Sequence, residues 1–266
     1  MRITSTQNPR ILRLMQLSKS HNRQEANLFV IEGFREISKA LSAGFTSESL
    51  FYCPELISTE GRRILDSIPL SVDQVEINHH VFEKIAYRDN KDGIILLSVP
   101  VYRQLEDYIP GKNPLIMVVE TIEKPGNLGA LLRTADAAGL DAVLVCDPQT
   151  DIYNPNVIRS SLGCIFTNQV ISCTSEAAIT YLKARSITIY AASLQTSILY
   201  TSVDFRVPSA IVLGSEAEGL SKIWLDNADK MIRIPMAGEA DSLNVSVSAG
   251  IILFEAVRQR GQGKKS

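Results

Sequence analysis

Hydrophobic positions follow two periods along the chain, and the two periods alternate. Short, nearly continuous apolar runs such as residues 115–119 and 142–145 predict buried strands. Between such runs, apolar residues recur three or four positions apart, as in residues 245–260, and this spacing predicts helices. Strands that alternate with helices are typical of an α/β fold with a largely parallel sheet.

A polar, turn-rich stretch interrupts this pattern near the middle of the chain. Residues 106–114 include Pro110, Gly111 and Pro114 among charged and amide residues. Proline and glycine punctuate secondary structure, and interdomain linkers share this composition. We therefore expect a first domain at 1–105, a linker at 106–114 and a larger domain at 115–266.

The first domain is expected to be a compact α/β unit. Asn8 followed by Pro9 predicts the start of a helix over residues 9–18, because asparagine caps a helix and proline suits its first turn. The other predicted elements are a strand at 29–31, a helix at 35–43 and a strand at 94–99.

The second domain is expected to be built around parallel strands. The predicted strands are residues 115–120, 142–145, 187–191, 210–213 and 231–234. The predicted helices are one that begins after Pro125 and stops at Gly139, one at about 175–184, and a final one at 245–260. The last helix is apolar around much of its circumference, which suits burial either within one subunit or against a second copy.

Composition narrows the class of protein. The 266 residues are 45% hydrophobic and 21% charged, with a net charge of −2, as in a globular protein. No apolar run approaches the roughly 20 residues that span a bilayer, and no apolar segment follows the basic start of the chain. We therefore expect a cytoplasmic protein without a membrane span.

The cysteines do not predict a metal site. They are scattered, without a C-x-x-C pair or a histidine at ligand spacing. Four reduced thiols are therefore expected, at Cys53, Cys146, Cys164 and Cys173.

Three segments of the second domain place polar residues after predicted strands. Residues 120–139 pass from a strand through Asn127 into a helix that carries Arg133, and residues 211–221 pass from a strand into a glycine-bearing acidic loop. Ligands of α/β folds bind at the carboxyl ends of strands. Each of these segments has an ordinary alternative, because glycines serve tight turns and an arginine on a helix is usually a solvated surface residue.

The third segment, residues 232–250, enters the final helix through Ser242 and Asn244, with Ser246 and Ser248 beyond. One of these polar residues is needed as a helix cap. Four of them at alternate positions exceed that need, so the segment indicates a polar pocket at the helix start.

Together, and in this order, the segments resemble the three motifs of the SpoU (TrmH) family of RNA methyltransferases in the SPOUT superfamily. The motifs are N-x-G-x-x-x-R-T-A-D-A-x-G at 127–139, G-S-E-x-E-G-L at 214–220 and I-P-M-x-G-x-x-x-S-L-N-V-S-V-S at 234–248. The earlier S-x-x-N-P at 5–9 and F-V-I-E-G at 29–33 look like the substrate-binding domain of ribosomal RNA methyltransferases.

The resemblance implies a fold, a reaction and a set of partners. The implied fold is a parallel-sheet SPOUT domain with a deep trefoil knot, preceded by a smaller L30e-like α/β domain. The implied reaction is methylation of a ribose 2′-hydroxyl, in ribosomal RNA of the 23S type, with S-adenosylmethionine as the cofactor. The implied assembly is a homodimer.

The resemblance also assigns residues to the site. The implied cofactor-binding residues are Ala192, Gly214, Ile234, Met236, Ser242 and Leu243. The implied catalytic group is Asn127, Arg133, Glu218, Ser242 and Asn244. Because a guanidinium stays protonated in proteins, we interpret Arg133 as a group that holds the adjacent phosphate and the developing oxyanion rather than as a base.

The first domain is expected to contact RNA through basic side chains, because RNA is held largely by its shape and its phosphates. The candidates are Arg10, Arg13, Arg23 and Arg35. Two alternatives stay open: a transfer-RNA 2′-O-methyltransferase with the same catalytic core, and a catalytically silent RNA-binding or ribosome-assembly protein. The presence of all the motif residues argues against the silent alternative.

Overall fold

The computed structural model describes residues 2–87, 92–194, 196, 198–215, 218–239 and 241–261. The protein forms two compact units. Unit 1 comprises residues 1–101 and 151–167, and unit 2 comprises residues 102–150 and 168–266. Both units are α/β, as the alternating pattern predicts.

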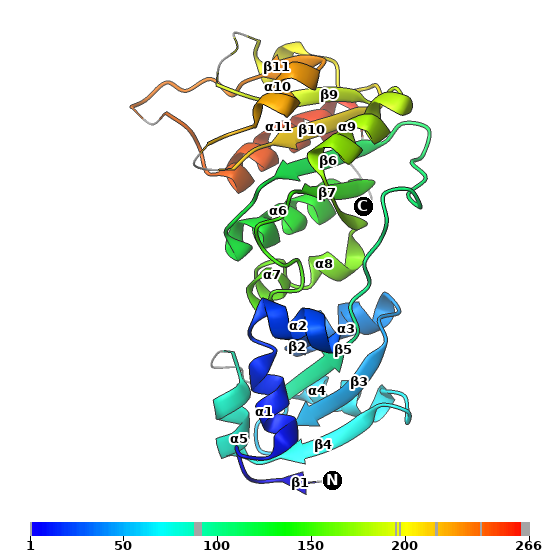
Figure 1. Ribbon diagram of the computed structural model, residues 1–266, viewed down its shortest axis with the longest axis vertical. Coiled ribbons are helices and arrows are strands. Elements are labelled where there is room, and N and C mark those ends of the chain that lie inside the picture. Colours follow the sequence, from blue (N-terminus) through cyan, green and yellow to red (C-terminus); the bar gives the residue numbers. More distant parts are fainter. Residues whose placement is uncertain are drawn as a thin grey trace. The chain divides into compact units, whose positions relative to one another are not determined.

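Unit 1 is built on a five-stranded mixed sheet of order β1-β4-β3-β5-β2 (Figure 1). β5 runs antiparallel to β2 and β3, whereas β4 is parallel to β1 and β3. The strands are β1 (Arg2–Ile3), β2 (Phe29–Glu32), β3 (Ser47–Tyr52), β4 (Asp73–Ile77) and β5 (Ile94–Ser98). The helices are α1 (Pro9–Gln16), α2 (Ser20–Ala26), α3 (Phe34–Ser42), α4 (Thr59–Ser67), α5 (His79–Ile85), α7 (Pro155–Ser160) and α8 (Cys164–Thr167).

Helix α1 begins where the sequence predicts. The side chain of Asn8 accepts a hydrogen bond from the amide of Arg10 at 3.0 Å, and Pro9 occupies the first turn. Ile11 and Leu14 are buried, so the apolar face of the helix packs into the core of unit 1 while its arginines face outward.

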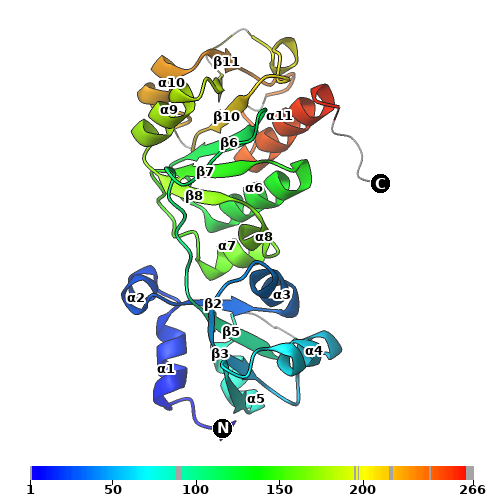
Figure 2. The ribbon, with the colours of Figure 1, turned by 90° about the vertical axis from the view of Figure 1, so that its right-hand side faces the viewer.

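Unit 2 is built on a six-stranded sheet, parallel throughout, of order β11-β9-β10-β6-β7-β8. The strands are β6 (Leu115–Glu120), β7 (Ala142–Cys146), β8 (Val170–Cys173), β9 (Thr188–Ala192), β10 (Ser209–Leu213) and β11 (Lys230–Ile232). The helices are α6 (Pro125–Ala138), α9 (Ser175–Ala184), α10 (Lys222–Asn227) and α11 (Val245–Gln259), with a 3₁₀ turn, η1, at Tyr200–Ser202. α6 and α11 cover one face of this sheet, and α9 and α10 cover the other (Figures 1 and 2).

The division into units differs from the expected linear one. Residues 151–167, which lie within the predicted second domain, fold into unit 1. There the ring of Phe29 lies 4.4 Å from that of Tyr153 and 6.0 Å from that of Phe166, measured between centroids. Tyr108 of the expected linker is buried in the core of unit 2, and so is Leu105, the last residue of the expected first domain.

Candidate active site

The carboxyl ends of three neighbouring strands surround a cavity in unit 2. β9, β10 and β11 are adjacent and parallel, so the loops that follow them emerge at one edge of the sheet. The cavity between these loops and the start of α11 has a volume of about 360 Å³. That volume lies in the range of small-molecule sites, and the position is where α/β sheets bind ligands.

The loop after β10 is closed tightly on itself. Ser215 and Gly219 exchange main-chain hydrogen bonds of 3.0 and 3.1 Å, and the amide of Glu218 donates to Oγ of Ser215 at 3.2 Å. A Cβ added at Gly214 would lie 2.1 Å from the carbonyl group of Gly219, so only glycine fits there. Glu216 and Ala217 of the second motif lie outside the described residues.

The cavity brings together residues from all three loops. Every residue that the resemblance assigns to the cofactor lines it: Ala192, Gly214, Ile234, Met236, Ser242 and Leu243. Glu218 also lines it, with an exposed side chain.

The lining is mixed in chemistry and fits the cofactor. Its floor is apolar, from side chains such as Leu213, Ile232 and Ile252, whereas Ser193, Ser215, Arg233 and Ser248 add polar groups at its edge. S-adenosylmethionine combines a flat adenine, a ribose and a charged amino-acid end, so it needs such a combination of apolar surface and dispersed polar groups.

A pair of asparagines lies beside this cavity. Asn244 is the N-cap of α11, and its Oδ1 accepts from the amide of Ser246 at 3.0 Å and from its hydroxyl at 2.6 Å. With Oδ1 engaged in the cap, Nδ2 of Asn244 donates to Oδ1 of Asn127, in the first turn of α6, at 3.3 Å. The first and third motifs are thus joined through two side-chain amides.

Arg133 lies on a different side of α6 from Asn127. It lies on α6 six residues after Asn127, which at 3.6 residues per turn places it roughly 120° around the helix. Its side chain is exposed and does not line the cavity. Among the described residues it makes no hydrogen bond or ion pair.

A buried carboxylate beneath the site was not singled out from the sequence. Glu120 ends β6 and is 3% exposed. Its Oε2 accepts from the amide of Ser221 at 2.8 Å, and its Oε1 accepts from the hydroxyls of Ser221 at 2.5 Å and Ser175 at 3.3 Å. Glu120 therefore fastens the end of the loop that follows β10. The feature of the sequence that could have indicated this role is an acidic residue at the end of an apolar strand.

The basic side chains predicted to contact RNA lie in two different environments. Arg10 and Arg13 are exposed and pair with Asp73 at 2.6 Å and with Glu48 at 2.9 Å. Arg35 is also exposed, with its guanidinium 5.7 Å from the centroid of the Phe34 ring.

Arg23 is a correction to the predicted set. Its side chain is 3% exposed, its Nε donates to Asp151 at 2.6 Å, and its Nη1 donates to the carbonyls of Leu17 and Ser18 at 2.7 and 2.9 Å. Nε and Nη1 of this guanidinium are thus hydrogen-bonded inside unit 1. Arg23 holds residues 151–167 in place and is not available to RNA.

The remaining expectations concern metals, thiols and membranes. The described residues contain no cluster of three or more histidine, cysteine or acidic side chains suited to a metal ion. The four cysteines are free thiols, with Cys146 and Cys173 at an Sγ to Sγ distance of 3.8 Å. Among the described residues, no helix has the length and apolar character needed to cross a membrane.

Comparison with known proteins identifies both parts of the chain. Residues 114–254 match the profile of the SpoU rRNA Methylase family, and residues 8–96 match that of the MRM3-like substrate binding domain. A curated relative, a 23S rRNA (guanosine(2553)-2′-O)-methyltransferase of Bacillus subtilis, is 27% identical over 95% of this chain and 97% of its own length.

Solved structures agree over nearly the whole length of the protein. A crystal structure of an RNA 2′-O ribose methyltransferase is 42% identical, covers 98% of this chain and 99% of its own, and has a TM-score of 0.87. An rRNA methyltransferase from Sinorhizobium meliloti, solved with bound AdoMet, is 29% identical, covers 97% of each protein and has a TM-score of 0.87. This chain therefore belongs to the SpoU rRNA Methylase family and is an S-adenosylmethionine-dependent RNA 2′-O-ribose methyltransferase.

Proposed function

We propose that this enzyme methylates a ribose of 23S-type ribosomal RNA at the cavity of unit 2. The observation that carries the proposal is the convergence of the implied cofactor residues on one cavity, beside the Asn127–Asn244 pair. The MRM3-like substrate-binding domain in the first part of the chain favours ribosomal RNA over transfer RNA, because it adds an RNA-binding surface to the catalytic core.

The bound cofactor supplies an electrophilic methyl group for an in-line displacement. In this proposal, Leu243 and the backbone around Gly214 and Met236 hold the cofactor against the apolar floor. Asn127, Ser242 and Asn244 orient the attacking hydroxyl, and positioning of this kind supplies much of the rate enhancement of two-substrate reactions. Glu218, at the rim of the cavity, supports the site from the loop after β10.

Arg133 is proposed to act on the RNA of the neighbouring active site in a homodimer. Within one subunit Arg133 lies roughly 120° around α6 from Asn127 and does not line the cavity, which favours its supply by a second subunit. Val247 and Phe254 are each 49% exposed and lie seven residues apart on α11, on a face with Ile251. An apolar stripe of this kind suits a two-fold interface between two copies of α11.

Two further features are proposed, one from family membership and one from the state of the cysteines. The segment from β10 to α11 is proposed to form the deep trefoil knot, and the order β11-β9-β10 at the sheet edge is compatible with such threading. A cytoplasmic location is also proposed, because four free thiols suit a reducing compartment.

The proposal is tested by tritium transfer from labelled S-adenosylmethionine to protein-free ribosomal RNA and to bulk transfer RNA. We expect label in ribosomal RNA with the wild-type enzyme and a loss of at least about 100-fold with Asn244→Ala, within the range that positioned groups contribute. Label in transfer RNA alone would overturn the assignment of ribosomal RNA as the substrate. If Asn244→Ala labels ribosomal RNA as well as the wild-type enzyme does, the assignment of the active site to this cavity is overturned.

A further inference from the structure

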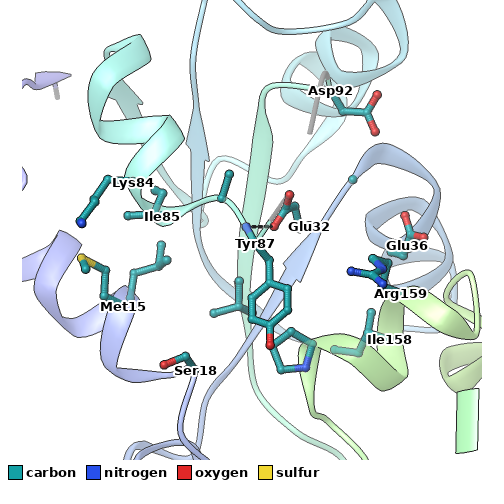
Figure 3. A pocket seen from close by; sticks show the side chains of 15 residues that line it. Met15, Ser18, Glu32, Glu36, Lys84, Ile85, Tyr87, Asp92, Ile158 and Arg159 are labelled. Atoms are coloured by element: carbon teal, nitrogen blue, oxygen red, sulfur yellow. Dashed lines mark hydrogen bonds between the residues drawn. The ribbon is translucent and has the colours of Figure 1, made fainter. Parts of the chain in front are cut away.

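Unit 1 contains a second cavity, of about 500 Å³, that the methyl-transfer reaction does not use. It lies among α1, β2, the start of α3, the end of α5 and α7 (Figure 3). Much of its wall is apolar, from residues that include Leu14, Met15, Val30, Ile85 and Ile158. The cavity is large enough for a small flat ligand.

One carboxylate faces this cavity without a partner from another residue. Glu36, in the first turn of α3, is 8% exposed and lines the cavity. Burial and the nearby charge of Asp92 raise the pKa of this carboxyl more than its own main-chain amide, Arg35 and Lys39 lower it. Within the described part of the protein, no other residue donates a hydrogen bond to the Glu36 carboxylate. An acceptor that faces a cavity in this state can accept hydrogen bonds from water or from a ligand.

The other carboxylates of the cavity hold the backbone. Oε2 of Glu32 accepts from the amide of Tyr87 at 2.7 Å, and Oδ2 of Asp92 accepts from the amide of Phe34 at 3.3 Å. These bonds fix the end of α5 and the start of α3 around the cavity (Figure 3). Among the described acidic residues that line the cavity, Glu36 is thus the one whose carboxylate accepts no hydrogen bond from another residue's backbone and can bind an occupant.

Among the described residues, the charges that line the cavity are of both signs and do not favour an ionic ligand. Lys84 and Arg159 line it together with the three carboxylates, and Figure 3 shows Arg159 on the same side as Glu36. A phosphate would meet the carboxylates, and a guanidinium or amine would meet the two cations. A neutral, flat group with two adjacent N–H donors satisfies Glu36 and matches the apolar wall.

Among the RNA bases, guanine has that donor pattern. Its Watson–Crick edge presents N1–H next to the exocyclic N2–H, whereas adenine, cytosine and uracil each place an acceptor beside a donor. An ionised carboxylate only accepts hydrogen bonds, so it pairs in bidentate fashion with guanine alone. Tyr87 is 46% exposed at the cavity, where its ring can stack on a base held by its edge.

We propose that the unit 1 cavity binds a guanine base, with Glu36 as the group that reads its Watson–Crick edge. The inference rests on the proposed function, because the occupant is an extruded guanosine of the RNA substrate, distinct from the nucleotide that is methylated in unit 2. The cavity therefore adds a sequence requirement that the catalytic site does not impose.

The first experiment measures binding of guanosine, inosine and adenosine 5′-monophosphates to the full-length protein by equilibrium dialysis. Inosine lacks the exocyclic amino group and retains N1–H, so it isolates the second hydrogen bond. Guanosine monophosphate is expected to bind at least about tenfold more tightly than either of the others, since a bidentate contact discriminates bases by about that factor or more. Equal affinities would overturn the inference.

Variants then locate the binding. Glu36→Gln replaces one acceptor oxygen with a donor, and Ala86→Trp fills the cavity without changing its charge; each should weaken guanosine monophosphate binding at least about tenfold. Glu60→Gln is the matched control, because Glu60 is an exposed acidic residue in the first turn of α4 and should leave binding unchanged. Binding that persists in both folded variants would overturn the inference, with folding judged from cooperative thermal melting.

Further binding experiments distinguish RNA from a free nucleotide and from a cationic peptide as the ligand of the cavity. A uridine heptanucleotide with one central guanosine should bind more tightly than free guanosine monophosphate and more tightly than the same RNA with adenosine. Binding of the free nucleotide without competition by this RNA would overturn the RNA assignment. Displacement of guanosine monophosphate by N-acetyl-arginine amide would assign the cavity to a cationic peptide instead and overturn the inference.

The same variants distinguish this inference from the proposed function. If the wild-type enzyme methylates ribosomal RNA and Glu36→Gln binds guanosine-bearing RNA as well as wild type does, the inference fails and the function stands. If no ribosomal RNA is methylated by the wild-type enzyme, the function fails whatever the dialysis shows.

Discussion

Nδ2 of Asn244 donates to Oδ1 of Asn127 at 3.3 Å, and this bond links the start of α11 to the start of α6. Asn244 also caps α11 through its other amide atom. One side chain therefore serves the stability of a helix with Oδ1 and the geometry of the proposed active site with Nδ2. The two roles can be separated by substitution.

Asn244→Asp is expected to keep the cap and lose the link. A carboxylate still accepts from the amide of Ser246, but it faces Oδ1 of Asn127 with a second acceptor. We expect the melting temperature to change little, whereas Asn244→Ala should cost about 1 kcal/mol of stability as the cap is lost. Methyl transfer to ribosomal RNA should fall in both variants by roughly 100-fold or more.

Asn154 provides the control for that substitution. It caps α7 in the same way, with Oδ1 accepting from the amide of Asn156 at 2.9 Å, but it lies in unit 1. Asn154→Asp should leave the rate of methyl transfer unchanged. A wild-type rate in Asn244→Asp would mean that the link between the two asparagines is not required.

The proposed sharing of Arg133 between subunits predicts complementation. Arg133→Ala and Asn244→Ala should each be inactive alone, and both should fold, since Arg133 is exposed. In a randomly exchanged mixture, half of the dimers are mixed and each mixed dimer has one intact site, so activity should return to about a quarter of the wild-type rate. No recovery, after subunit exchange is demonstrated by a tag on one variant, would place Arg133 and Asn244 of the same subunit in one site.

The buried ion pair of unit 1 predicts a large difference between two arginines. Arg23→Met leaves the carboxylate of Asp151 buried and unpaired and should destabilise the protein by about 3–5 kcal/mol. Arg13→Met removes an exposed pair with Glu48 and should cost about 1 kcal/mol or less. Urea unfolding followed by circular dichroism measures both. The double variant Arg23→Met, Asp151→Leu should recover only part of the loss, because no charge is left unpaired but the carbonyls of Leu17 and Ser18 and the amide of Tyr153 lose their partners.

The sequence predicted local features well, and it predicted contacts between distant residues poorly. The start of α6 after Pro125 and its end at Gly139, which has φ of 65°, follow from proline and glycine preferences that act within one turn. The burial of Arg23 depends on Asp151, which lies 128 positions later, and no local pattern indicates such a partner.

The same contrast between local features and distant contacts holds for the candidate site. Family motifs identified residues that the structure places around one cavity, including Gly214 and Leu243. Glu120 was part of the first motif segment, yet its role depends on Ser221 at the far end of another loop, 101 positions later. The cavity of unit 1 was also missed, because α7 reaches it only through the insertion of residues 151–167 into that unit.

Burial of Glu36 predicts a pH-dependent stability difference. Desolvation, aided by Asp92, raises the pKa of this carboxyl in the folded protein above its ordinary value. A group whose pKa is raised on folding stabilises the fold below its unfolded pKa, and this contribution is lost as the pH rises through the folded pKa. Glu36→Gln cannot ionise. Its free energy of unfolding relative to wild type should therefore rise from about pH 4 to pH 7, as wild type loses the contribution of its protonated carboxyl.

Urea unfolding at a series of pH values, with Glu60→Gln as the exposed control, measures this difference. The other carboxyls titrate alike in the variant and in wild type, so their effects cancel in the comparison. If the free energy of unfolding of Glu36→Gln relative to wild type instead falls as the pH rises, the Glu36 carboxylate is stabilised by a partner inside unit 1. The proposed guanine base would then compete with that partner, and Glu36→Gln would weaken guanosine monophosphate binding by less than about tenfold.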